Sequence, residues 1–221
     1  METTTPIQIQ SENIRERIIQ EYVHHVLEHG REPASVYKFA QSLGISEEEF
    51  YNYFSSFQGV KEGLWEQIFD QTYSSMHAQA VYTQYNSKEK LLAFYYTWLE
   101  VLKKHRSFLL VAYPLPESLR KMPSPELKAF KTKFQAFVQE LVLQGKEAGL
   151  LADRKFFSDR YPDALWLETL FIFQFWLRDT SQGFEKTDAA IEKSVTLAFD
   201  LMGRTAVDSL VDFAKFLYQS K

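Results

Sequence analysis

Apolar side chains recur three or four residues apart through most of the chain, which is the spacing of one buried face on an α-helix. Strand signals are scarce, because no Asn-Gly or Asp-Gly turn occurs and no segment alternates apolar and polar residues over a sustained length. The pattern therefore predicts an all-α fold of about nine helices.

Capping residues, glycines and prolines set the expected helix boundaries. In the first third of the chain, helices are expected at residues 11–30, 33–43, 46–54 and 59–79. Later helices are expected to begin at caps or prolines, namely Ser87, Ser124, Pro162 and Thr187, and Gly203 is expected to bend or split the last one. Four prolines between Tyr113 and Pro125 predict a loop there.

The longest apolar stretch, Ala164 to Leu177, has about 14 residues, whereas a bilayer-spanning helix needs roughly 20. It predicts a buried helix that is apolar almost all round, and such a helix is covered either by its own chain or by a second subunit. With the last helix it is expected to form a four-helix dimer interface. The expected interface residues are Leu170, Phe171, Phe175, Val195, Phe199 and Met202.

The composition is that of a folded globular protein, with 45% hydrophobic and 24% charged residues. The absence of cysteine excludes disulfides, thiol nucleophiles and cysteine zinc sites. Residues Met1 to Gln10 contain neither a basic residue nor an apolar run, so we expect no signal peptide and a cytoplasmic location.

Motifs for catalysis are missing: the sequence has no glycine-rich phosphate loop, no Gly-x-Ser-x-Gly elbow and no His-Glu-x-x-His. His25 and His29 lie one helical turn apart, with Glu21 a turn earlier, which is the edge of a metal site or a solvated surface stripe. We expect no enzymatic activity, no cofactor and no metal.

The most specific feature is Val36 to Phe54, where two short helices meet at Gly44. Ala40 allows a close approach of the two helices, and Phe39 and Phe50 supply apolar contacts at the spacing of a helix-turn-helix. Glycine at the turn accepts a positive φ at little cost. A plain αα-hairpin is the other interpretation, and the motif favours the helix-turn-helix.

At these residues the sequence resembles the TetR family of bacterial regulators. The segments that carry the resemblance are Ser35 to Ala40, Gly44 to Ser46 and Phe50 to Ser55, within residues 11–70. The resemblance implies an all-helical homodimer with a DNA-binding module at residues 1–58. It implies a ligand-binding and dimerisation domain at residues 59–221. The candidate DNA-contacting residues are Lys38, Ser46, Glu47, Glu49, Tyr51, Asn52, Tyr53 and Lys61.

The predicted recognition helix departs from the family pattern, because it opens with Glu47, Glu48 and Glu49, which repel phosphates. The same residues form a good first turn, with Ser46 and Glu49 as a capping box. Phe57 stands near the place where the family usually has a lysine. Residues 1–62 hold five basic and ten acidic side chains, a net charge of −5, while the rest of the chain carries +1.

Aromatic residues are abundant, with 19 Phe, 12 Tyr and 4 Trp, and many fall on helices of the second half. For any single ring, core packing is the ordinary explanation. Together, and with the cavity that the family resemblance implies, they predict a pocket for a small hydrophobic ligand. The expected pocket residues are Phe94, Tyr95, Trp98, Tyr113, Phe130, Phe134, Phe137, Trp166 and Phe173.

Two functions remain open on the sequence. One is a TetR-type regulator whose hydrophobic effector changes the separation of the two recognition helices and so releases DNA. The alternative is a TetR-fold protein that binds a hydrophobic ligand or lipid, has lost DNA binding, and docks a basic protein partner through its acidic face.

Overall fold

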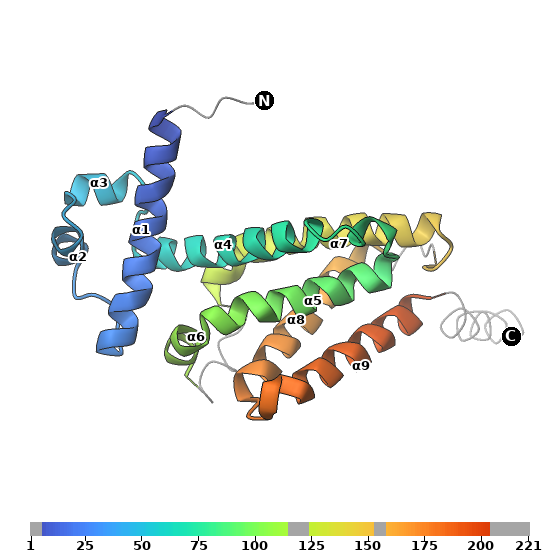
Figure 1. The fold of residues 1–221 in the computed structure, drawn as a ribbon. Helices are drawn as coiled ribbons and strands as arrows, with labels where there is room; N and C mark the ends of the chain where they lie inside the picture. Colours follow the sequence, from blue (N-terminus) through green and yellow to red (C-terminus); the bar gives the residue numbers. More distant parts are fainter. Residues whose placement is uncertain (1–5, 115–123, 153–157, 204–221) are drawn as a thin grey trace, which may run out of the picture. The chain divides into compact units, whose positions relative to one another are not determined.

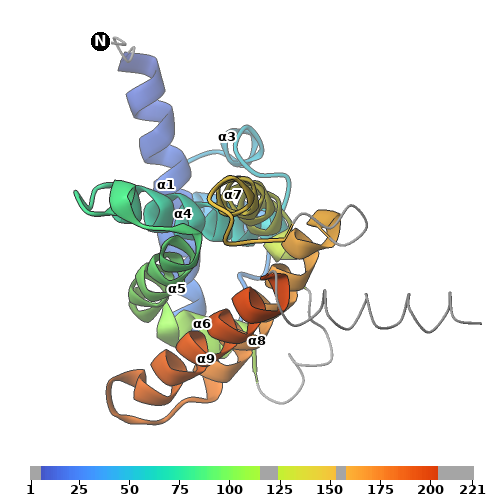
Figure 2. The ribbon, with the colours of Figure 1, turned by 90° about the vertical axis from the view of Figure 1, so that its right-hand side faces the viewer.

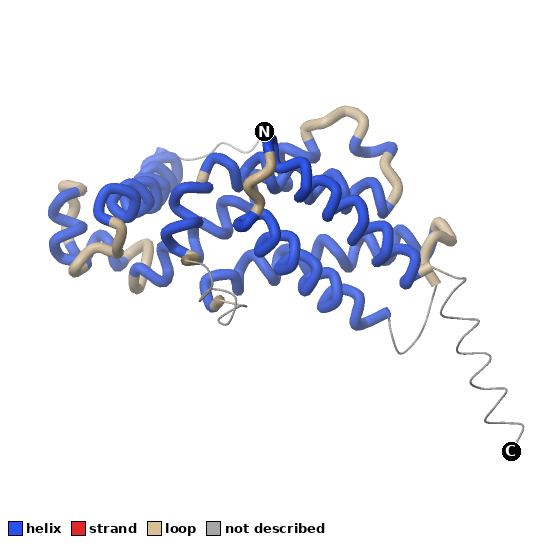
Figure 3. Tube along the Cα trace, turned by 90° about the horizontal axis from the view of Figure 1, so that it is seen from below, coloured by secondary structure: helices blue, strands red, loops and turns tan. Residues whose placement is uncertain are grey.

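A computed structural model gives the structure for residues 6–114, 124–152 and 158–203, with side chains described from residue 14 onward. Within these ranges all regular secondary structure is helical (Figures 1 and 3), so the predicted all-α fold is confirmed. No helix in the described ranges is long and apolar enough to span a bilayer.

The chain packs as two compact units, here called unit 1 (Met1–Ile68 and Leu102–Phe130) and unit 2 (Phe69–Val101 and Lys131–Lys221). Helices α4, α5 and α7 contribute residues to both units. The expected division of the chain into a DNA-binding module (residues 1–58) and a ligand-binding and dimerisation domain (residues 59–221) is a division by function, and it stays a prediction.

Unit 1 contains the two short helices of the predicted motif, which lie to one side of the first helix (Figure 1). Its elements are α1 (Pro6–His29), α2 (Val36–Ser42), α3 (Glu47–Tyr51), the first part of α4 (Phe57–His77), α6 (Arg106–Ala112) and the 3-10 turn Pro125–Leu127. Ser35 and Ser46 cap α2 and α3 by accepting backbone N–H bonds. Gly44 has a φ of +69°, as the turn requires.

Aromatic rings hold α1 to α4 together. Phe39 lies 6.2 Å from Phe50, 5.5 Å from Phe57 and 6.4 Å from Tyr22, measured between ring centroids. Gly63 lets α4 approach this core, because a Cβ there would lie 2.8 Å from a ring carbon of Phe54. The contacts that the motif predicts are therefore made.

Unit 2 contains the long helices of the second half. They are α5 (Ser87–Lys104), α7 (Lys128–Glu147), α8 (Tyr161–Arg178) and α9 (Glu185–Met202). Figure 2 shows α8 and α9 running side by side, and the two helices pack on one another. The core between the helices is aromatic.

Two expected helix starts and one expected cap are wrong. The first helix begins at Pro6 rather than Ser11, because proline is well suited to a first helical position. The cap of α5 is Asn86, which exchanges two bonds with Glu89, and not Ser87. Helix α9 begins at Glu185, and Thr187 is not its cap.

The carboxylate of Asp179, at the end of α8, organises the start of α9. It accepts bonds from the backbone N–H and hydroxyl of both Ser181 and Thr187, at 2.6 to 2.9 Å. Gly203 ends α9. The expected loop before Pro125 lies largely outside the described residues, as does any helix after Gly203.

Candidate functional site

The predicted recognition helix α3 is short and acidic. Glu47, Glu48 and Glu49 form its first turn, and the Ser46 hydroxyl accepts a bond from the backbone N–H of Glu49 at 3.0 Å. Tyr51 is exposed and donates its hydroxyl to the Glu47 carboxylate at 3.2 Å. Ser46 therefore caps the helix, while the glutamates set its charge and Glu47 holds the tyrosine hydroxyl.

Most cations around the motif are engaged within the chain. Arg15 pairs with Glu66 at 2.9 Å, and its guanidinium lies 5.3 Å from the centre of the Phe54 ring. Arg17 donates to the Leu43 carbonyl oxygen at 3.1 Å, at the end of α2. These side chains stabilise the fold rather than offering charge to phosphates.

The two candidate DNA-contacting lysines differ, because Lys61 is paired with a carboxylate whereas Lys38 is exposed. Lys61 donates to a Glu32 carboxylate oxygen at 2.8 Å, and the Tyr22 hydroxyl donates to the same oxygen at 3.0 Å. Partial burial acts to raise the pKa of Glu32, but the bonds and charge of Lys61, with the Tyr22 bond, lower it overall. Lys38, on α2, is exposed. Ser46 and Asn52, at the two ends of α3, are also exposed, while Tyr53 is half-buried.

A polar network that sequence reasoning missed lies inside unit 1. The Trp65 Nε1–H donates to the Tyr113 hydroxyl at 2.8 Å, which donates to Glu126 at 2.8 Å. The amide of Gln58, at the start of α4, donates to the other Glu126 oxygen at 3.1 Å. Burial acts to raise the pKa of Glu126, but the hydrogen bonds outweigh it and lower the pKa. Tyr113 thus belongs to this network.

The predicted pocket residues of unit 2 are brought together and buried. Phe94 lies 5.2 Å from Phe134 and 5.1 Å from Phe137 between ring centroids. Trp98 lies 6.1 Å from Phe173. The other two members, Tyr95 and Trp166, are buried as well. The remaining candidates, Tyr113 and Phe130, pack against Trp65 in unit 1.

Neither of the two hollows described below is lined by a predicted pocket residue. The rings themselves are buried and packed against one another. The ligand pocket stays a prediction.

Glu168 is a further residue that sequence reasoning passed over. It lies on α8, and both carboxylate oxygens are buried without a hydrogen-bond partner among the described residues. Burial raises its pKa to about 7, against the opposing influence of the nearby Ser194 hydroxyl. The sequence did contain a signal for this residue, because Glu168 is the one charged residue in the apolar stretch between Ala164 and Leu177.

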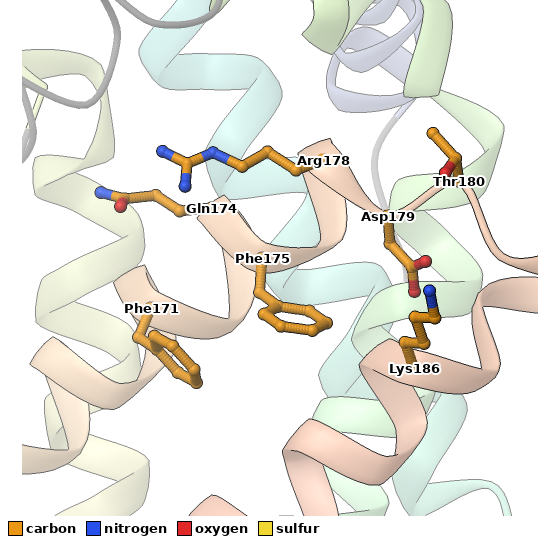
Figure 4. A pocket seen from close by; sticks show the side chains of 7 residues that line it. All are labelled: Phe171, Gln174, Phe175, Arg178, Asp179, Thr180 and Lys186. Carbon is orange, nitrogen blue, oxygen red and sulfur yellow. The ribbon is translucent and has the colours of Figure 1, made fainter.

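Helices α8 and α9 present an exposed apolar face. Its most exposed members are Leu167 (66% exposed), Phe171 (50%), Leu197 (59%) and Leu201 (53%). A hollow of about 280 Å³ shares Phe171 with this face (Figure 4) and is lined by Phe171, Gln174, Phe175, Arg178, Asp179, Thr180 and Lys186. A second, of about 370 Å³, is lined by Glu192, Lys193, Thr196, Leu197 and Asp200.

The predicted interface residues divide between this face and the core. Phe171 is exposed, and Phe175 and Phe199 are half-buried. The other three, Leu170, Val195 and Met202, are buried within the chain. The exposed face is therefore rotated from the predicted one, so that Leu167, Leu197 and Leu201 take the outer positions.

His25 and His29, on α1, stack with ring centroids 4.2 Å apart. The pKa of His25 is lowered by burial and by the neighbouring His29. No group of three or more histidine, aspartate and glutamate side chains in the described ranges is placed to hold a metal ion.

Comparison with known proteins identifies related sequences and folds. A family model described as the tetracyclin repressor-like C-terminal domain matches residues 90–217. The TetR transcriptional regulator from Nitrosomonas europaea ATCC 19718 has a TM-score of 0.56 and 16% identity, over 84% of this chain and 97% of that chain. A protein of unknown function from Rhodococcus sp. RHA1 has a TM-score of 0.56 and 14% identity, over 86% of this chain and 95% of that chain.

No curated protein matches the chain. At these identities the structural likeness shows the fold alone, and the predicted TetR-like architecture is confirmed.

Proposed function

Because the chain belongs to the TetR family, we propose that it is a transcriptional regulator that binds DNA as a homodimer and responds to a hydrophobic effector. The observation that carries the proposal is the helix-turn-helix itself, with both helices capped and the turn at Gly44 in the required conformation. The family match and the Nitrosomonas regulator support this function over the lipid-binding accessory protein.

The DNA-contacting surface is centred on α2 and α3. Lys38 is the candidate for a phosphate contact, because it is exposed, whereas Lys61 is committed to Glu32. Tyr51 and Asn52 are exposed and available for base or sugar contacts. Glu47 and Glu48 are also exposed, so affinity for DNA is expected to be weak in general. Specific binding is expected to depend on hydrogen-bond donors that a carboxylate can accept from, such as the amino group on a cytosine edge.

The effector binds in the aromatic core of unit 2, and the dimer forms through the exposed face of α8 and α9. An apolar face with four large side chains between 50% and 66% exposed is typical of an interaction surface. Burying this face between two copies gives the closed two-fold assembly that is commonest among homo-oligomers.

Fluorescence anisotropy with a pool of double-stranded DNA tests the proposal. We expect binding in the micromolar range at about 50 mM salt, weakening as salt rises, because non-specific affinity comes from phosphate contacts. Replacing Glu48 by Lys on α3 should strengthen it. The matched control is Glu147→Lys at the exposed end of α7, which makes the same charge change on a residue of unit 2, outside the helix-turn-helix.

Absence of binding by the wild type and by Glu48→Lys, with both variants folded and dimeric, would contradict the DNA-binding half of the proposal. A gain that is equal in Glu48→Lys and Glu147→Lys would show a general charge effect and would contradict the assignment of α3 as the contacting helix.

A further inference from the structure

The carboxyl of Glu168 is the strongest chemical anomaly in unit 2. Its two oxygens are buried in an otherwise apolar helix and accept no hydrogen bond in the described part of the chain. A buried polar group without a partner is costly, and natural proteins keep few of them. Such a group calls for an explanation other than packing.

The nearby hydroxyl groups are already committed. The Tyr95 hydroxyl, from α5, lies 3.4 Å from the Leu165 carbonyl oxygen and 3.1 Å from the Thr169 hydroxyl. The Ser194 hydroxyl, from α9, donates to the Ile191 carbonyl oxygen at 3.2 Å. The Ser194 hydroxyl lies close enough to Glu168 to oppose the rise of its pKa, but neither carboxylate oxygen has a hydrogen-bond partner of good geometry in the described part of the chain.

The charges on the packed elements do not compensate Glu168. Tyr95 is neutral, since burial and the Glu168 charge hold its pKa well above the ordinary value. On α9, Asp188 and Glu192 act on Tyr96 of α5 and are acidic themselves. No cation contributes to the pKa of Glu168 among the described residues.

Aromatic rings begin next to this carboxyl. The Tyr95 ring lies 6.4 Å from Trp98 and 6.3 Å from Phe134 between centroids. Aromatic faces attract cations, and more strongly when the site is dry. A buried acid beside aromatic rings suits a molecule with a cationic head and an apolar body.

We propose that Glu168 anchors the effector and that the effector is a lipophilic amine, whose ammonium group donates to the carboxylate while its apolar part lies among the rings of unit 2. The inference rests on the proposed function, in which the aromatic core holds the effector. These rings are in contact in the structure, so binding separates rings of α5, α7 and α8, and the apparent affinity is reduced by the cost of opening.

The test compares three probes with the same chain length: dodecylamine, dodecanol and dodecanoate, each below its solubility limit and, for the two ionic probes, below the micelle-forming concentration. Binding to the full chain is measured by equilibrium dialysis and by the shift in thermal unfolding. The wild type should bind dodecylamine at least about tenfold more tightly than dodecanol, the scale of one charged hydrogen bond. Glu168→Gln should abolish this preference, and Glu168→Met is a second variant that leaves no polar group.

The pH dependence separates a direct contact from a structural effect. An alkylamine keeps its charge between pH 6 and pH 8, whereas the Glu168 carboxyl, with a pKa of about 7, must lose its proton to receive it. Dodecylamine affinity should therefore fall about tenfold from pH 8 to pH 6 in the wild type. The fall should disappear in Glu168→Gln and persist in Glu147→Gln, an exposed control.

Equal binding of dodecylamine and dodecanol by the wild type would overturn the amine assignment and leave the hydrophobic effector in place. An unchanged amine preference in both Glu168 variants would overturn the role of this residue. Failure of all three probes to bind would overturn the inference together with the effector half of the proposed function. The DNA-binding half would be unaffected, because the DNA titration tests it separately.

Discussion

Replacing Glu168 by Met should stabilise the protein, and the gain should grow with pH. The substitution exchanges a buried carboxyl with no hydrogen-bond partner for an apolar side chain of similar length that adapts to irregular gaps. The chain then no longer needs to bury an ionisable group. The prediction depends on the local environment of α8 and not on any ligand.

The magnitude follows from the pKa. In the folded protein it is raised from 4.5 to about 7, so the folded state holds its proton to higher pH than the unfolded chain does. Below pH 4.5 the carboxyl is protonated in both states, so Glu168 lowers the free energy of unfolding very little. As pH rises from 4.5 towards 7, the unfolded chain loses the proton first, and the folded protein becomes progressively less stable. One pKa unit corresponds to about 1.4 kcal/mol, so the full cost at pH 8 is about 3 kcal/mol, an upper bound if neighbouring groups relax.

Urea unfolding at pH 5, 6, 7 and 8, at one fixed protein concentration, measures the effect for the wild type, Glu168→Met and the control Glu147→Gln. The free energy of unfolding of Glu168→Met should exceed that of the wild type by less than about 1 kcal/mol at pH 5 and by about 3 kcal/mol at pH 8. Parallel profiles for the wild type and Glu168→Met, or a less stable variant at pH 8, would refute the reasoning, because the carboxyl would then be solvated or paired.

Three other changes test the packing and the candidate DNA surface. Gly63→Ala should lower the free energy of unfolding, measured in urea, by about 1–3 kcal/mol, because the new Cβ would lie 2.8 Å from a ring carbon of Phe54. The control Gly59→Ala, whose Cβ would have no atom closer than 3.8 Å, should be neutral or stabilising in the same assay. Tyr113→Phe removes the hydroxyl between two buried partners and should cost about 1–3 kcal/mol in the same assay; a loss as small as that of a surface mutation would contradict the network. Lys38→Ala should weaken DNA binding and reduce the salt slope by about 1, and Lys61→Ala should do so less; the reverse order in a salt titration would show that Lys61 leaves its carboxylate to bind phosphate.

Local features of the chain were predictable. The turn at Gly44, the caps at Ser35 and Ser46 and the apolar spacing around Phe39 depend on residues a few positions apart. Helix starts were less certain where several polar residues compete, as at Asn86 and Ser87. Neighbouring side chains that offer similar caps differ only in the geometry of the folded turn.

The candidate site was predictable in composition but not in geometry. The sequence identifies Phe94, Phe134 and Phe137 as a group on separate helices, and the structure packs them against one another. Whether a group of rings is a closed core or an open pocket depends on how the helices fit together. That fit has no signal in the spacing of residues along one helix.

The sequence by itself determined the all-α fold, the helix-turn-helix and its acidic charge, because helical periodicity, caps and formal charge are properties of neighbouring residues. Only the tertiary structure decided that Lys61 is paired with Glu32, that Leu167 is exposed while Leu170 is buried, and that the carboxylate oxygens of Glu168 are buried without a hydrogen-bond partner in the described part of the chain. The physical reason is that burial and pairing are set by groups from other helices. An almost wholly apolar helix such as α8 carries no polar stripe to indicate which of its faces meets them.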